Sequence, residues 1–178
     1  MTSRTGAGIL VCGLNGAGKS TLGKALAEEL GYHFIDIEDL YFPKTDPSYL
    51  YACPRTREEV EKLLSHEIEA HQKFVLASVR VDDWSAVRAF FRCAVLIDVP
   101  KEIRMRRVRD RSFRKFGGRM LPGGDLYEQE EAFFTFVNAR AENAVEQWLR
   151  TVDCPVIRID GTRPVAENTG VILKYLNK

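Results

Sequence analysis

Short apolar segments alternate along the chain with segments whose apolar residues recur every three or four positions. Five of the short segments are predicted strands, at residues 8–12, 33–37, 74–79, 94–99 and 156–159. Apolar runs of this length between helical patterns are typical of parallel strands that helices cover on both faces. The pattern therefore predicts an α/β protein, a three-layer sandwich with a five-stranded parallel sheet.

The helical segments begin and end at recognisable signals. Residues 20–30 carry leucines on one face and stop at Gly31. Residues 56–59 match a capping box and predict a second helix. Three further helices are predicted. One starts at Ser85 and has Phe90 and Phe91 on its apolar side, and a long one runs from Asp125 to Trp148. The last starts at Pro164, with Thr162 as its cap.

Two segments fit neither a strand nor a short helix. Residues 42–54 contain three prolines and predict a loop on the substrate side, where Tyr41, Tyr49 and Tyr51 can stack on a ring. Residues 114–124 contain four glycines and one proline and predict a mobile flap.

Residues 13–20 read Gly-Leu-Asn-Gly-Ala-Gly-Lys-Ser, a full match to GxxxxGK[ST] between a predicted strand and a predicted helix. Glycines at 13, 16 and 18 let the backbone wrap an anion, and the start of the helix adds its dipole. The motif predicts triphosphate binding by Gly13, Asn15, Gly16, Ala17, Gly18, Lys19, Ser20 and Thr21. In this arrangement Lys19 reaches the β- and γ-phosphates, and the Ser20 hydroxyl ligates Mg²⁺. The alternative is a glycine-rich turn without a ligand.

Composition narrows the class of protein. With 45% hydrophobic and 29% charged residues, the 178-residue chain is neither disordered nor collagen-like. The 26 basic and 25 acidic residues leave a net charge of +1, which gives no general attraction to nucleic acid or membranes. The four cysteines form no CxxC pair and predict reduced thiols, and the three histidines are expected to be structural or exposed. The first apolar stretch is too short for a signal peptide or a membrane span, so a cytoplasmic protein is expected.

Charge is concentrated in one segment. Residues 101–119 contain nine basic and two acidic residues, a local balance of +7. Arg107 and Arg111 lie one helical turn apart, so both can meet one triphosphate. Arg104, Arg106 and Arg109 are expected to be solvated. The alternative for the whole segment is a solvated basic helix, or a basic helix that binds RNA.

The chain is too short for an AAA+ module with its helical lid domain, and it has no NKxD or TKxD segment of a small GTPase. It resembles the adenylate kinase-like small kinases, which include adenylate, shikimate and gluconate kinases. Three segments carry the likeness besides the phosphate loop: residues 98–102, Asp-Val-Pro-Lys-Glu, followed by the two arginines; residues 159–167; and residues 34–40.

The resemblance implies a nucleoside monophosphate kinase-like P-loop NTPase fold with a helical lid. It implies one kinase domain over 1–178, with an acceptor-side insertion at about 40–72 and a lid at about 104–125. ATP and Mg²⁺ would be the cofactors. By the same resemblance Arg107 lies against the adenine or the phosphates, Arg111 bonds the transferring phosphoryl group, and Arg163 and Pro164 lie in the segment whose backbone touches the adenine. Arg140 matches a phosphate-binding arginine, although it can equally pair with Glu142.

Asp36 ends a predicted buried strand, where a charge is costly unless it faces a cation or a cleft. In shikimate-type kinases the matching Asp holds the Mg²⁺ shell. Ser78 stands where adenylate kinases carry an acidic residue, which moves the metal role to Asp36. Asp36 can also accept a hydrogen bond from the acceptor hydroxyl, or cap a helix.

The remaining candidates lie on the acceptor side. Arg57 and Arg80 can bind an anionic acceptor but can also be ordinary surface residues. Glu38 and Asp39 are either substrate contacts or charges at a helix start.

The sequence thus predicts a phosphotransferase that moves the γ-phosphoryl of Mg-ATP to a small-molecule or nucleotide acceptor, with Lys19, Asp36 and Arg111 as catalytic residues. Two alternatives remain: a regulatory ATPase without an acceptor, and a polynucleotide-end kinase. No membrane partner is expected, nucleic acid is disfavoured, and the chain is expected as a monomer or homodimer.

Overall fold

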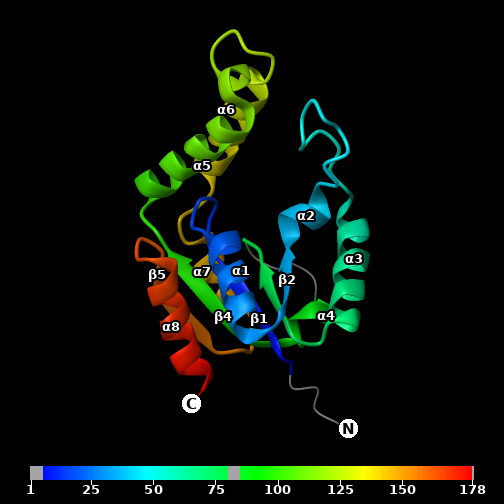
Figure 1. Ribbon diagram of the computed structural model, residues 1–178, viewed down its shortest axis with the longest axis vertical. Coiled ribbons are helices and arrows are strands. Elements are labelled where there is room, and N and C mark those ends of the chain that lie inside the picture. The colour runs from blue at the N-terminus through cyan, green and yellow to red at the C-terminus, as the bar shows by residue number, and fades with distance from the viewer. Residues whose placement is uncertain (1–5, 80–84, 178) are drawn as a thin grey trace.

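The computed structural model describes residues 6–79 and 85–177. One parallel sheet has the strand order β2-β3-β1-β4-β5 (Figure 1). Its strands are β1 (Gly8–Cys12), β2 (His33–Asp36), β3 (Phe74–Ala77), β4 (Phe91–Asp98) and β5 (Val156–Asp160). The predicted five-stranded parallel sheet is confirmed.

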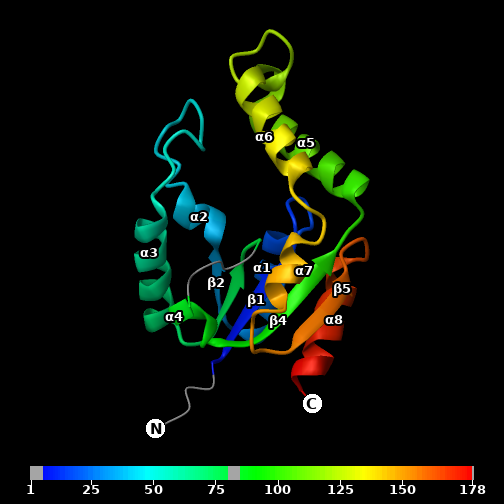
Figure 2. The same ribbon diagram turned by 180° about the vertical axis from the view of Figure 1, so that it is seen from behind.

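Helices cover both faces of the sheet, which explains why the strands β1 and β3 are apolar and buried throughout. The helices are α1 (Lys19–Leu30), α2 (Ile37–Tyr41), α3 (Arg57–Ala70), α4 (Ser85–Arg88), α5 (Lys101–Phe116), α6 (Tyr127–Ala139), α7 (Ala144–Leu149) and α8 (Val165–Leu176), with a 3₁₀ turn η1 (Gly117–Met120). Ile9 and Val11 of β1 pack with residues of α1 and α8. Leu10 and Cys12 pack on the opposite face with residues of α3 and α7, which lies in front of the sheet in Figure 2. Burial on both faces removes β1 almost completely from water.

The helices α5 and α6 extend beyond the carboxyl ends of the strands (Figure 1). We call α5, η1 and α6 the helical arm, residues 101–139. It has a small apolar core of its own, formed by Val108, Phe116, Met120, Leu126, Phe134 and Val137. Tyr49 and Tyr51, from the loop between α2 and α3, pack against this core. The arm and the loop thus meet above the sheet edge at which the phosphate loop lies.

The predicted helix at Ser85 is much shorter than expected. It ends at Arg88, and Phe91 opens β4 instead of continuing the helix. The Phe91 ring packs against Phe74 with a centroid distance of 5.9 Å. Strand pairing beside β1 therefore outweighs the local helical spacing of these aromatic residues.

The predicted long helix from residue 125 to 148 is broken in two. Helix α6 ends at Ala139, Arg140 has an extended backbone with ψ 130°, and α7 starts at Ala144. The break returns the chain from the arm to the sheet. It also brings Glu142 to a buried arginine, a contact across 38 residues that periodicity does not show.

Two smaller expectations are corrected. Thr162 does not cap α8, because its N–H and hydroxyl both donate to Asp160 Oδ1, at 2.9 and 2.6 Å. Pro164 occupies the N-cap position, and α8 begins one residue later. The predicted flap at 114–124 is in part regular structure, since α5 runs to Phe116 and η1 follows it. Phe116 and Met120 are buried in the arm.

Within the described part of the chain, no helix is long and apolar enough to cross a membrane.

All four cysteines are free thiols, as the sequence predicts.

Candidate active site

The phosphate loop connects β1 to α1 and depends on glycine at particular positions. Gly16 has φ 82°, and a Cβ there would lie 2.4 Å from the carbonyl oxygen of Arg104. Gly18 has φ 98° and precedes α1 without a side-chain cap. The first N–H groups of α1 are therefore left without a capping side chain, in the arrangement that binds anions at a helix start.

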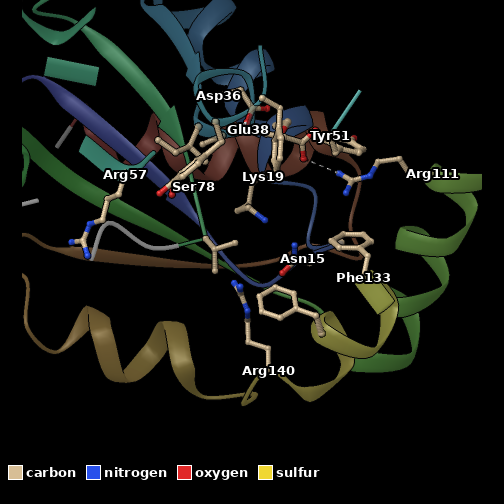
Figure 3. A pocket seen from close by; sticks show the side chains of 18 of the residues that line it. Asn15, Lys19, Asp36, Glu38, Tyr51, Arg57, Ser78, Arg111, Phe133 and Arg140 are labelled. Atoms are coloured by element: carbon tan, nitrogen blue, oxygen red, sulfur yellow. Dashed lines mark hydrogen bonds and ion pairs between the residues drawn. The ribbon is translucent and has the colours of Figure 1, made fainter. Parts of the chain in front are cut away.

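Lys19 is the cation at the centre of this site. Its Nζ donates to the carbonyl oxygen of Leu14 at 3.2 Å. Burial, followed by the charge of nearby Arg111, lowers the pKa of Lys19 to about 8, and the charge of Asp36 opposes the shift. Figure 3 shows Lys19 between Asp36 and Glu38 on one side and Arg140 on the other. The two nearby cations, Lys19 and Arg111, favour an anionic ligand, because an anion would stabilise the charge of both side chains.

A cavity of about 710 Å³ opens at the phosphate loop. The predicted site residues that line it are Asn15, Gly16, Lys19, Ser20, Asp36, Glu38, Arg57, Arg111 and Arg140. Ser78 also lines it and is almost completely buried. The structure thus brings three groups to one cavity. They are the phosphate loop, the acidic residues at the end of β2 and the start of α2, and three arginines from distant parts of the chain.

Aromatic side chains form much of the remaining wall, namely Tyr41, Phe42, Tyr49, Tyr51, Phe133 and Phe136. The helical spacing of Phe133 predicts core packing, and this ring packs against the core of the arm and also lines the cavity. Tyr49 is fixed from the other side, because its hydroxyl donates to Glu130 Oε1 at 2.9 Å. Glu130 is only 1% exposed, so this hydrogen bond joins the loop to the interior of the arm.

Asp36 is both the last residue of β2 and the N-cap of α2. Its Oδ1 accepts a hydrogen bond from the Glu38 N–H at 3.0 Å. The capping alternative is therefore present in the structure. It does not compete with metal binding, because a carboxylate offers two oxygens and Asp36 lines the same cavity as Ser20. Ser20 and Asp36 form an oxygen donor set of the kind that Mg²⁺ takes up together with phosphate oxygens.

Glu38, in α2, contacts residues of the arm across the cavity. Its Oε2 lies 3.9 Å from Arg111 Nη1, and its Oε1 lies 3.8 Å from Lys115 Nζ. The Tyr51 hydroxyl donates to Oε1 at 3.2 Å. Burial, followed by the charge of Glu38, raises the pKa of Tyr51, so the hydroxyl keeps its proton and remains a donor. Arg111 is therefore held at the cavity by an acid from the opposite wall.

Arg104 corrects an expectation, because it is not solvated but 3% exposed. Its Nε donates to the Val99 carbonyl at 3.0 Å, and Nη1 donates to the Asn15 carbonyl at 3.4 Å. Nη2 reaches both carboxylate oxygens of Glu142, at 2.8 and 2.6 Å. A buried guanidinium is tolerated because it is paired and hydrogen-bonded. Arg104 thus ties the phosphate loop to the base of the arm.

The sequence contains a signal for this burial. Arg104 lies four residues before Val108, and Ser112 and Phe116 continue the same stripe at intervals of four. All four residues are buried, so helical periodicity placed Arg104 on the inner face of α5.

Arg107 lies between two predicted nucleotide-binding segments. Its Nη2 donates to the Gly161 carbonyl at 3.0 Å and its Nη1 to the Gly16 carbonyl at 3.4 Å. Arg163 instead pairs with Glu167 at 2.7 Å and with Asp160 at 3.7 Å on the surface.

Several predicted residues lie outside the cavity. Ala17 and Gly13 are buried within the loop, Thr21 and Arg163 are exposed, Pro164 caps α8, and exposed Asp39 pairs with Lys44. Arg80 lies outside the described residues.

Known proteins resemble this chain in the sequence of the phosphate-loop region and in fold. A family model described as an AAA domain matches residues 9–118. The uncharacterized protein YqaC of Bacillus subtilis is 28% identical over 179 residues, which cover 95% of this chain and 97% of the relative. A shikimate kinase of Synechococcus elongatus is 28% identical over 117 residues, 61% of this chain and 60% of that enzyme. The crystal structure of a sugar kinase from a Janibacter species has a TM-score of 0.56 at 18% identity, over 97% of this chain and 95% of its own.

The length of the chain argues against an AAA+ module with its helical lid domain, yet a family model described as an AAA domain matches part of the chain. It covers β1 to the end of α5, the nucleotide-binding core, and extends no further than residue 118. The resemblance to small P-loop kinases is confirmed by these relatives, and the prediction of a phosphotransferase agrees with those that are named as kinases. Since the family model covers well over half of the chain, the chain belongs to the family of P-loop proteins described as an AAA domain, and among named relatives it is similar to shikimate kinases.

Proposed function

We propose that this chain is a kinase that transfers the γ-phosphoryl group of ATP to a small acceptor. The observation that carries the proposal is that a phosphate loop and a set of acceptor-type groups share one cavity of about 710 Å³. A nucleotide switch needs the loop alone, whereas a kinase needs room for a second substrate in line with the terminal phosphate.

The phosphate side of the cavity supplies positive charge and N–H donors. In the proposed complex, the loop N–H groups bind the phosphates and Lys19 Nζ exchanges its Leu14 carbonyl for a phosphate oxygen. Arg111 turns from Glu38, at 3.9 Å, to the transferring phosphoryl group. Ser20 and Asp36 would hold Mg²⁺, which neutralises charge on the β- and γ-oxygens when bound. Lys19, Asp36 and Arg111 are thus the proposed catalytic residues.

The acceptor side offers a hydrogen-bond acceptor, cations and flat apolar surfaces. Asp36 or Glu38 can orient the acceptor hydroxyl, while Arg57 and Arg140 line the far wall as partners for an anionic group. The tyrosine and phenylalanine rings provide faces for a planar or ring-shaped body. The acceptor is therefore a small hydroxyl compound, with a nucleoside monophosphate as one candidate.

A part of the helical arm is the proposed lid of a single kinase domain. The lid, residues 104–125, carries Arg107 and Arg111, and the acceptor-side insertion, residues 40–72, carries Tyr49 and Tyr51. Contacts of Tyr49 with Glu130 and of Glu38 with Arg111 already join the two walls. Closure over substrates would exclude water and suppress hydrolysis. We further propose a cytoplasmic enzyme, monomeric or homodimeric, that phosphorylates a small acceptor rather than a polynucleotide end.

The experiment is a turnover assay with ATP, Mg²⁺ and a panel of acceptors, nucleoside monophosphates first and small hydroxy compounds second. The proposal expects ATP consumption to rise sharply with one acceptor and to be lost in Lys19→Ala. Hydrolysis that no acceptor stimulates would favour the regulatory ATPase instead. Phosphorylation of nucleic-acid ends, with binding that weakens steeply with salt, would favour the polynucleotide kinase.

A further inference from the structure

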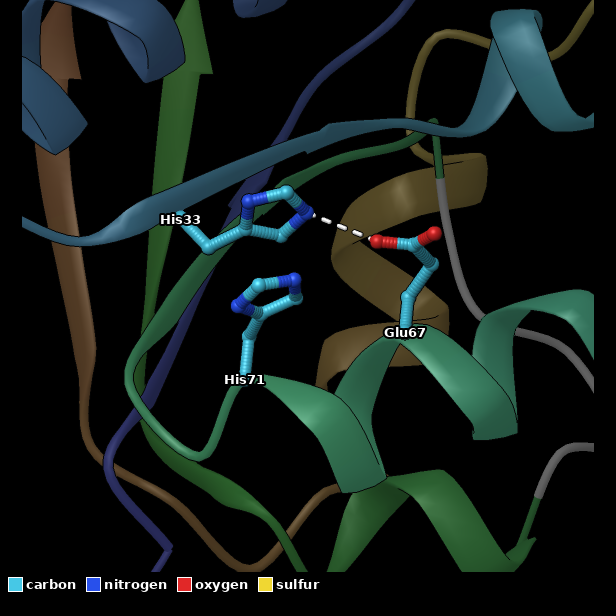
Figure 4. Close-up of side chains that lie close together, drawn as sticks. All are labelled: His33, Glu67 and His71. Atoms are coloured by element: carbon cyan, nitrogen blue, oxygen red, sulfur yellow. Dashed lines mark hydrogen bonds and ion pairs between the residues drawn. The ribbon is translucent and has the colours of Figure 1, made fainter.

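A second cluster of chemically active side chains lies away from the cavity. His33 opens β2, and Glu67 and His71 stand one turn apart at the end of α3 (Figure 4). His33 Nε2 lies 2.7 Å from Glu67 Oε2. The His71 ring stacks on the His33 ring with a centroid distance of 3.7 Å and an interplanar angle of 18°. None of the three residues lines the cavity at the phosphate loop.

The three side chains offer ligand atoms that converge. One ring nitrogen from each histidine and one oxygen of Glu67 all lie within 4.8 Å of one another. Ligand atoms around a tetrahedral zinc ion are about 3.4 Å apart, as metal–ligand distances of about 2.0–2.1 Å require. To reach this spacing the exposed His71 side chain has to rotate out of its stack on the His33 ring.

The chemistry of the set selects a class of metal. Two imidazoles and one carboxylate are borderline ligands that suit Zn²⁺ and its neighbours Co²⁺ and Ni²⁺, whereas Mg²⁺ prefers oxygen ligands alone. Glu67 and His71, at positions i and i+4, supply two ligands from one helix face, and His33 supplies the third from the neighbouring strand.

We propose that His33, Glu67 and His71 form a binding site for a transition-metal ion of the zinc class, with the fourth position open to water. The site joins the beginning of β2 to the end of α3. Asp36 lies at the other end of β2, and Arg57 lies at the other end of α3. A bound ion would therefore fix the relative position of two elements whose far ends face the cavity. The site is independent of the proposed kinase activity, because it uses none of the same residues.

The test measures metal binding directly, on protein without an affinity tag, stripped with a chelator. All samples carry Cys53→Ser, because Cys53 is an exposed thiol. Zn²⁺ affinity is measured by competition with a chromophoric chelator, and Co²⁺ binding by its visible spectrum. We expect one equivalent of Zn²⁺, an intense four-coordinate Co²⁺ spectrum, and no competition from millimolar Mg²⁺.

Three variants complete the experiment. His71→Ala and Glu67→Gln should each weaken Zn²⁺ binding at least tenfold, while far-UV circular dichroism confirms that they fold. His66→Ala is the matched control, since His66 is an exposed histidine on the same helix outside the cluster, and it should bind Zn²⁺ like the parent protein. Absence of stoichiometric binding would overturn the proposal, and so would equal losses in His66→Ala and His71→Ala. In either case the trio would be a hydrogen-bonded cluster only. Binding that persists in Lys19→Ala, without kinase activity, would separate the two proposals.

Discussion

Replacement of Arg104 by alanine tests whether one buried guanidinium joins the arm to the phosphate loop. The change removes the charged hydrogen bond to the Val99 carbonyl, the longer one to the Asn15 carbonyl and the bidentate pair with Glu142. A hydrogen bond to a charged group contributes about 1.5–3 kcal/mol. The Glu142 side chain is 54% exposed and regains water, so its pairing adds at most about 1 kcal/mol. We therefore expect Arg104→Ala to lower the free energy of unfolding by about 3 kcal/mol.

The assay is thermal and urea unfolding, with Arg106→Ala as the control on the exposed face of the same helix. For a chain of this size a loss of about 3 kcal/mol lowers Tm by about 6–12 °C. Arg106→Ala should change stability by less than about 0.5 kcal/mol. Nucleotide affinity should fall in Arg104→Ala alone, because Asn15 belongs to the phosphate loop. Equal stability and equal nucleotide affinity of the two variants would refute the reasoning.

Three further predictions concern the cavity. The pKa of Lys19 is lowered from its ordinary 10.5 to about 8, so the ligand-free folded protein binds fewer protons than the unfolded chain between these values. The contribution of Lys19 to stability should therefore rise as pH increases from about 8 to 10.5. Nucleotide affinity should fall above about pH 8, because Lys19 loses its charge. Calorimetric titrations at several pH values should show this fall in the parent protein and not in Lys19→Met. Gly16→Ala should abolish nucleotide binding, because its Cβ would lie 2.4 Å from the Arg104 carbonyl oxygen at φ 82°. By contrast, Gly170→Ala, with open space around its Cβ, should raise stability by about 0.5–1 kcal/mol in the same unfolding assay. Arg111→Ala should lower turnover at saturating ATP by about 10²-fold with little change in Tm, and unchanged turnover would remove Arg111 from the transfer step.

Local signals were sufficient for much of the fold. The apolar runs located all five strands within three residues. For β1 and β3 the reason is that strands buried on both faces cannot include polar residues without cost. The capping box at Thr56 is present, with Thr56 and Glu59 hydrogen-bonded to each other's backbone N–H groups. The phosphate loop is recognisable in the sequence because its chemistry requires two glycines, a lysine and a hydroxyl at fixed positions within eight residues.

Contacts between distant segments explain what local patterns missed. The break between α6 and α7 follows from Glu142 reaching Arg104, and the end of α4 follows from the pairing of Phe91 beside β1. The role of Glu38 depends on Arg111 and Lys115, which lie more than 70 residues later on the other wall. Such pairs are set by the tertiary structure, so neither periodicity nor composition contains them.

The central claim is that the cavity at the phosphate loop holds an acceptor that receives the γ-phosphoryl group. The most direct measurement uses γ-labelled ATP with the stimulating acceptor and divides the label between phosphorylated product and inorganic phosphate. The account predicts that most of the label enters the product and that Arg111→Ala and Lys19→Ala lose this transfer. Label found only in inorganic phosphate, at the same rate with every acceptor, would contradict it.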